Sequence, residues 1–241
     1  MSREGLAGGA SRGLVLLNFP ISLVAVAIVG VLLERGASRP LGAAAIALCA
    51  VTAWPGVVDQ DDLDARLVNA VPAAGVALAL ALTVAARPRL SLAARRPFDR
   101  ARAAVAVAAL LVAVPWLFAE AGFYAPDPVL SDEVPRGEKL AAVHLGHHHG
   151  TDGVLLVLCA LVLSRVARSR LLWAYLSLML VYGAANAVQD GWLEQVEKRG
   201  WTDVGLPSLL VPELSVAWVM IAAGAAAVYL LTRGARAGRA R

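Results

Sequence analysis

The chain has 241 residues, of which 59% are hydrophobic and only 17% are charged, and its mean hydropathy is +0.67. Soluble domains have about 45–50% apolar and about 25% charged residues, so this composition argues against a soluble globular protein. The net charge of +4 comes almost wholly from arginine. Because these arginines lie in short segments between apolar stretches, without aromatic residues to stack on bases, the charge does not indicate nucleic-acid binding.

Seven apolar segments are predicted as membrane helices, each of which needs about 20 residues. The fifth reaches this length only if it begins near Val143 and so includes a histidine cluster. We therefore predict an all-α protein of the cell membrane, a polytopic transmembrane helix bundle that forms a single domain over residues 1–241. The segments run approximately over 14–33, 41–58, 67–86, 103–124, 153–166, 171–188 and 209–231.

Basic residues predict the orientation, because loops rich in arginine and lysine stay on the cytoplasmic side of a membrane. Fifteen of the 22 basic residues fall in 35–39, 87–102, 165–170 and 233–241, which share one side if seven helices span. We therefore expect the N terminus outside and the C terminus in the cytoplasm. Arg3 and Arg12 conflict with this orientation, and a six-span bundle in which the first or second segment does not cross would remove the conflict.

Acidic residues are still more one-sided, since 16 of the 18 lie on the outer side and only Glu34 and Asp99 lie inside. Acidic residues contribute little to topology, so this asymmetry indicates another cause. Polar residues within the segments also lie in outer halves, namely Asn18, Asn69, Glu120, Asn186 and Glu213.

Five prolines fall in the outer halves of the predicted helices, where each is expected to kink its helix. They are Pro20, Pro55, Pro72, Pro115 and Pro212. Together with the polar residues they predict a bundle that is dry at its cytoplasmic end and open to water at its outer end. A purely interfacial position of these residues is the alternative.

All four histidines lie within six residues, in the segment HLGHHHGTD that ends at Asp152. Imidazole nitrogens are common metal ligands, and a carboxylate often completes such a site. If the segment is helical, His144, His148 and Asp152 lie on one face and His147 flanks them. These four residues are our predicted metal ligands. Gly146, Gly150 and Gly153 weaken the helix prediction, so a glycine-rich loop around an ion is equally workable.

Further carboxylates lie on the same side and could converge on the histidines through folding. Asp59 and Asp62 belong to one acidic segment, Glu120 lies in the outer half of the fourth predicted helix, and Asp190 lies four residues before Glu194. We expect Asp59, Asp62, Glu120 or Asp190 to act as an additional ligand or a general base. Zn²⁺, Mn²⁺, Fe and Ca²⁺ all remain candidates for the divalent metal. A pH-sensing histidine cluster and a solvated polar loop are the alternatives.

Two short patterns resemble parts of known family motifs. His144-x-x-His147-His148 resembles one histidine box of the membrane fatty-acid desaturases, but those enzymes use several boxes. Asp59-x-x-Asp62 with Ala65-Arg66 resembles part of the CDP-alcohol phosphotransferase signature, but the following glycine and the later aspartate pair are missing. Neither resemblance is complete enough to imply a function for this chain.

Three functions therefore stay open. The first is a metal-dependent membrane enzyme that takes a lipid-like substrate from the bilayer at its outer end. The second is a proton- or cation-coupled transporter that uses Glu120 and Glu213. The third is an accessory or assembly subunit whose alanine- and glycine-rich helices, as at 223–227, pack on other membrane subunits. Cys49 and Cys159 are expected to be small buried hydrophobic residues rather than a disulfide.

Overall fold

A computed structural model describes residues 18–54, 66–87, 96–120, 149–197, 202–209 and 212–237. Within these ranges there are seven α-helices and no strands, which confirms the predicted all-α class. Short 3-10 turns continue α3 (η1, Val51–Ala53) and precede α4 (η2, Leu67–Asn69), and a π-helical turn follows α7 (η4, Leu193–Glu197). The helices are α2 (Pro20–Leu33), α3 (Arg39–Ala50), α4 (Ala70–Ala86), α5 (Asp99–Glu120), α6 (His149–Leu163), α7 (Arg170–Trp192) and α8 (Val216–Ala237).

Each of the seven predicted segments overlaps one of these helices. Three helical stretches in the described ranges are long and apolar enough to cross a membrane, namely Leu67–Ala86, Arg170–Trp192 and Val216–Arg233. Three shorter apolar helices, Pro20–Leu33, Arg39–Ala53 and Gly150–Leu163, lie beside them. The composition of the chain and these helices together are those of a membrane protein.

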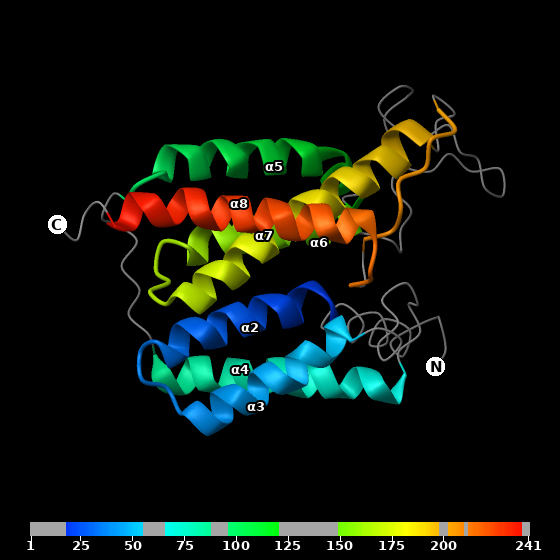
Figure 1. Cartoon of the computed structure of the whole chain (residues 1–241). Helices are drawn as coiled ribbons and strands as arrows, with labels where there is room; N and C mark the ends of the chain where they lie inside the picture. The colour runs from blue at the N-terminus through cyan, green and yellow to red at the C-terminus, as the bar shows by residue number, and fades with distance from the viewer. Residues whose placement is uncertain are drawn as a thin grey trace.

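Consecutive helices run in opposite directions, so the bundle has two distinct ends (Figure 1). We call the end that holds the α2–α3 turn, the start of α5, the α6–α7 turn and the end of α8 the arginine end. The opposite end, where α6 begins and α7 finishes, is the acidic end. Helices α2, α3 and α4 form one packed group, and α5 to α8 form another (Figure 1). Helix α2 joins the groups, because it also packs on α6 and α7.

Helices α6 and α7 form the most closely packed pair, and glycine makes their approach possible. A Cβ atom added to Gly153 would lie 2.4 Å from the carbonyl oxygen of Gly183. In the reverse direction, a Cβ atom on Gly183 would lie 2.6 Å from the carbonyl oxygen of Gly153. The two backbones therefore touch without intervening side chains, as small residues allow in membrane helix pairs. Gly150 and Gly153 accordingly lie inside α6, although glycine weakened the sequence-based prediction of a helix there.

The arginine end is held together by Glu34 and Asp99, the two acidic residues predicted to lie inside. The Glu34 carboxylate accepts hydrogen bonds from the backbone N–H groups of Arg168 (2.7 Å) and Ser169 (2.6 Å). Asp99 forms ion pairs with Arg102 (3.1 Å) and Arg165 (3.2 Å). The backbone N–H of Arg96 donates to Asp99 and is the main cause of a pKa below the usual value for this carboxyl. Both acids thus hold the α6–α7 turn against neighbouring helices.

The prolines do not kink the helices in the predicted way where the structure describes them. Pro20 is the first residue of α2, Pro72 lies in the first turn of α4, and Pro212 precedes α8. A first-turn proline lacks only an N–H that has no partner within the helix, so it starts a helix without bending it. The predicted kinks at Pro20 and Pro212 are therefore wrong, whereas Pro72 directly follows the junction of η2 with α4, where the kink stays a prediction. Pro115 lies inside α5, and Pro55 lies outside the described residues.

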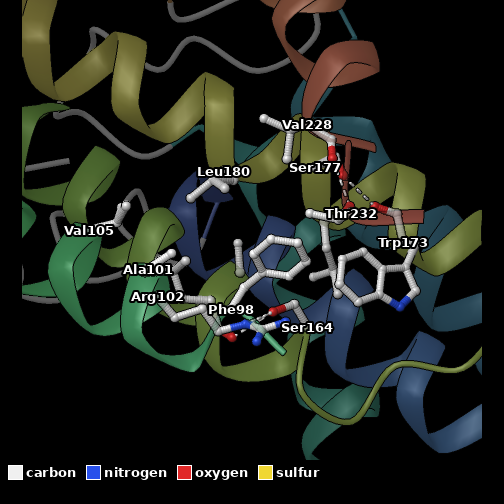
Figure 2. A pocket seen from close by; sticks show the side chains of 13 residues that line it. Phe98, Ala101, Arg102, Val105, Ser164, Trp173, Ser177, Leu180, Val228 and Thr232 are labelled. Carbon is white, nitrogen blue, oxygen red and sulfur yellow. Dashed lines mark hydrogen bonds between the residues drawn. The ribbon is translucent and has the colours of Figure 1, made fainter. Parts of the chain in front are cut away.

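The predicted dryness of the arginine end stays a prediction, but the helices do not pack completely there. A pocket of about 160 Å³ lies there among α5, α6, α7 and α8 (Figure 2). Its wall includes Arg102, Ser164, Ser177 and Thr232, which are polar residues in helix halves that the sequence presented as almost entirely aliphatic. Small hydroxyl side chains are inconspicuous in an apolar helix because they hydrogen-bond to their own backbone, as Ser177 does to Trp173 (2.9 Å).

Gly153→Ala is expected to destabilise the protein by about 1–3 kcal/mol, because the added methyl group would meet the backbone of α7, which cannot turn aside. Thermal unfolding of detergent-purified protein measures the effect. Gly224→Ala in α8 is the matched control, since its nearest neighbour is a methyl group of Val181 at 3.2 Å. The control should be neutral or slightly stabilising, because alanine favours a helix. Equal effects of the two substitutions would contradict the assigned backbone contact.

Candidate functional site

The candidate site lies at the acidic end of α6 and α7, in the register that the Gly153–Gly183 contact sets. This contact places the first turn of α6 beside the last turns of α7. Asp190 is there almost fully buried, with 1% of its surface exposed. Its Oδ2 atom accepts a hydrogen bond from the backbone N–H of Gly150 at 3.1 Å. A carboxylate at this position satisfies an N–H group that has no helical partner and opposes the positive end of the α6 dipole.

Asp152 is the second carboxylate of the site. It is half-buried in the first turn of α6 and lies close enough to Asp190 to interact with it electrostatically. Asp152 forms no ion pair with any basic residue in the part of the chain that the structure describes. Two carboxylates, one from the last turns of α7 and one from the first turn of α6, therefore lie at the same end of this helix pair, and their mutual repulsion favours a cation or a shared proton near them.

Asn186 and Tyr182 continue the polar region into the bundle, one and two helical turns from Asp190. Asn186 is fully buried, and its amide nitrogen donates to the backbone carbonyl of Tyr182 at 2.9 Å. Its Oδ1 atom has no hydrogen-bond partner among the described residues. Tyr182 is itself buried, so the row of polar residues on α7 extends from Asp190 into the interior.

An aromatic pocket of about 140 Å³ lies on the other side of Tyr182. The Tyr182 ring packs edge-on against Phe19, with 6.1 Å between ring centroids, and is tilted 5.2 Å from the ring of Trp218. The Nε1 atom of Trp218 is buried and has no hydrogen-bond partner within the described ranges. Because aromatic and aliphatic side chains line it, this pocket suits an apolar group.

A pair of buried amides belongs to the same end but to the other helix group. Asn18 donates to the backbone carbonyl of Asn69 at 3.0 Å, and the Asn69 side chain donates back to Asn18 Oδ1 at 3.2 Å. The Oδ1 atom of Asn69 accepts from the backbone N–H of Arg66 at 2.7 Å. These bonds tie α2 to the start of α4. The two asparagines satisfy each other, so they have a structural role and do not add ligands to the site.

The structure brings together only two of the predicted site residues, Asp152 and Asp190. His149, the first residue of α6, places the histidine cluster immediately before that helix. His144, His147 and His148 themselves lie outside the described residues, as do Asp59 and Asp62. Glu120 is the last residue of α5, and its side chain also lies outside the described part.

Metal binding gains no direct support from the described side chains, because no group of three or more His, Cys, Asp or Glu residues among them is placed to hold an ion. Asp152 and Asp190 alone would supply only two of the ligands that a bound metal ion needs. Glu213 does not lie within the apolar part of α8 as the transport hypothesis requires, because it is exposed and precedes that helix. Cys49 and Cys159 are free thiols, as expected.

Sequence reasoning missed the aromatic pocket and the role of the glycines. Phe19, Tyr182 and Trp218 come from three helices, so no local pattern connects them. The sequence does show that Gly153 and Gly183 each follow a polar residue, Asp152 and Tyr182, within an apolar helix. Small residues permit close helix contact, but their partners cannot be identified from spacing alone.

No family model, curated protein or solved structure matches the chain. The site is therefore interpreted from its own geometry and chemistry.

Asp190→Ala is expected to destabilise the protein by about 1–3 kcal/mol, because it leaves the buried N–H of Gly150 without its acceptor. Asp190→Asn should cost less, since the amide oxygen can still accept that bond. Hydrogen exchange at the first turn of α6, together with thermal unfolding, measures the difference. Asp203→Ala, in an exposed non-helical segment, is the control and should change neither quantity. Faster exchange in the asparagine variant than in the alanine variant would exclude this capping role.

Proposed function

We propose that the chain is a multi-pass protein of the cell membrane in which seven helices span the bilayer, with the arginine end in the cytoplasm. The antiparallel order of the seven helices supports this topology (Figure 1). The arginine-bearing turns come together at one end, where ion pairs and hydrogen bonds join them. Loops rich in arginine are retained in the cytoplasm, so the acidic end faces outward and the N terminus lies outside.

We further propose that the acidic end holds the divalent-metal site of a membrane enzyme. The observation that carries this proposal is that Asp190 accepts a hydrogen bond from Gly150 in the first turn of α6, the same turn that contains Asp152. A divalent cation would relieve the repulsion between these carboxylates. His144, His147 and His148 precede α6 by a few residues, so they can reach the same site and supply nitrogen ligands. Ligands of both kinds suit Zn²⁺, Mn²⁺ or Fe, whereas oxygen ligands alone would suit Ca²⁺.

The aromatic pocket gives the proposed enzyme a place for the apolar part of its substrate. Tyr182 lines the pocket and lies two helical turns from Asp190 on α7. A lipid-like substrate that enters from the bilayer could therefore place its apolar group against Phe19 and Trp218 and its polar bond toward the carboxylates. A bound metal would polarise an ester or phosphate or activate a water molecule. Asp59, Asp62 or Glu120 would serve as a further ligand or as a general base.

Metal content of detergent-purified protein without a His tag tests this proposal. We expect one tightly bound metal per chain in the wild type after supply of Zn²⁺, Mn²⁺, Fe²⁺ and Ca²⁺. The double substitution His147→Ala/His148→Ala should abolish metal retention, and Asp152→Asn should weaken it at least tenfold, as loss of a ligand does. Asp203→Asn is the matched control and should retain the metal. A folded wild-type protein that binds none of these metals would rule out the proposed site.

A further inference from the structure

The pocket at the arginine end is separate from the outward-facing site and has a different chemistry. Its walls are mainly aliphatic, with Val105, Leu161, Leu180 and Val228 from four different helices. Figure 2 shows Arg102 and Ser164 beside each other at one side of this pocket, with the ring of Phe98 next to them. A volume of about 160 Å³ is close to that of cavities that hold one benzene ring, so it accommodates a section of one hydrocarbon chain.

The hydroxyl groups of the pocket do not make its interior polar. Ser164 donates to the backbone carbonyl of Leu161 at 2.7 Å, and Thr232 donates to that of Val228 at 2.7 Å. Ser177 likewise donates to its own helix. Because each hydroxyl proton is used within its helix, the pocket presents few donors to a ligand away from Arg102. An apolar chain therefore fits the interior better than a polar solute.

Arg102 gives one side of the pocket a positive charge. Its side chain is only 14% exposed, and its Nε atom donates to Ser164 Oγ at 2.8 Å. Its Nη1 atom donates to Asp99 and to the carbonyl of Pro97, whereas its Nη2 atom forms no hydrogen bond within the described part of the chain. Asp99 is shared with Arg165, so one carboxylate faces two guanidinium groups. The cluster keeps a net positive charge and an available donor for an anion.

Two further features point to a ligand that comes from the bilayer. Helix α5 packs mainly on α6, and α8 packs on α7, so the pocket lies between two helices that make little direct contact with each other. Val105 and neighbouring large apolar side chains of α5 are exposed, as expected of a surface that faces lipid tails. Phe98 has a φ of 63°, a strained conformation for a bulky residue that is often found at functional positions.

We propose that this pocket binds one anionic phospholipid of the cytoplasmic leaflet. Its phosphate would lie against Arg102, and part of one acyl chain would fill the space between α5 and α8. Anionic lipids are concentrated on that side of the membrane, where they attract basic residues. The site rests on the proposed topology, with the bundle in a bilayer and the arginine end in the cytoplasm, but it does not depend on the proposed metal or enzyme activity.

Lipid binding to delipidated protein in detergent tests the proposal, with native mass spectrometry and thermal unfolding as readouts. We expect retention of one phosphatidylglycerol per chain and a larger increase in unfolding temperature than phosphatidylcholine gives. Ala101→Trp should block the pocket, because Ala101 is exposed and lines it, so the variant should fold and lose both effects. Ala103→Trp is the matched control, since Ala103 is exposed on the same helix but does not line the pocket.

The headgroup contact is tested by Arg102→Gln, which should weaken phosphatidylglycerol binding about tenfold, as expected for loss of one charged hydrogen bond. Arg100→Gln, an exposed arginine outside the pocket, should leave binding within about twofold. Equal binding of the two lipids, or retained binding in Ala101→Trp, would overturn the proposal. An increase in unfolding temperature with inorganic phosphate alone, equal to that with phosphatidylglycerol, would also overturn it, because the ligand would then be a soluble anion.

Discussion

The backbone contact between Gly153 and Gly183 is the constraint on which the arrangement of the acidic end depends. It fixes how far α6 is displaced along α7, and with that register Asp190 lies against the N–H of Gly150 while Asp152 lies near Tyr182. A side chain at either glycine would separate the helices, and the buried carboxylate would lose its backbone donor. The polar site is therefore a consequence of close packing between two apolar helices. In α6, the glycines that allow this packing lie beside the polar residues of the site.

The same helix pair is held at its other end by two carboxylates from outside the pair. Glu34 accepts the backbone N–H groups of the α6–α7 turn, and Asp99 pairs with Arg165 from that turn. Any carboxylate at an end rich in arginine interacts favourably with the nearby positive charges. Glu34 and Asp99, however, both contact the same α6–α7 turn. We infer that the α6–α7 hairpin is the rigid centre of the bundle. The Tyr175 hydroxyl strengthens this centre by donating to the carbonyl of Leu23 in α2 at 2.8 Å.

Much of the fold could be predicted because it depends on the local composition of the sequence. Runs of apolar residues predicted the seven helices, and the concentration of arginine predicted which turns share an end. The pairing of side chains depends on contacts between distant residues, and spacing could not predict it. Asn18 and Asn69, interpreted as water-facing or interfacial, in fact satisfy each other across two helices. Pro20 and Pro212 were expected to kink helices but lie at the start of α2 and before α8, because an apolar run does not show where helical hydrogen bonding begins.

The sequence predicted a carboxylate-containing site at the acidic end, but only some of the residues that form it. An excess of acidic residues on one side required a cause that topology does not supply, and Asp152 and Asp190 are two of these residues that the fold brings to the same end of one helix pair. The two carboxylates are 38 positions apart in the sequence, one in each helix of the α6–α7 hairpin, so only the folded structure brings them to the same end. Two acids placed together at this depth cost free energy unless a cation or proton accompanies them. An arrangement that is costly without such a partner, held by a glycine contact that any larger side chain would disturb, is better explained by a role at the acidic end than by stability alone.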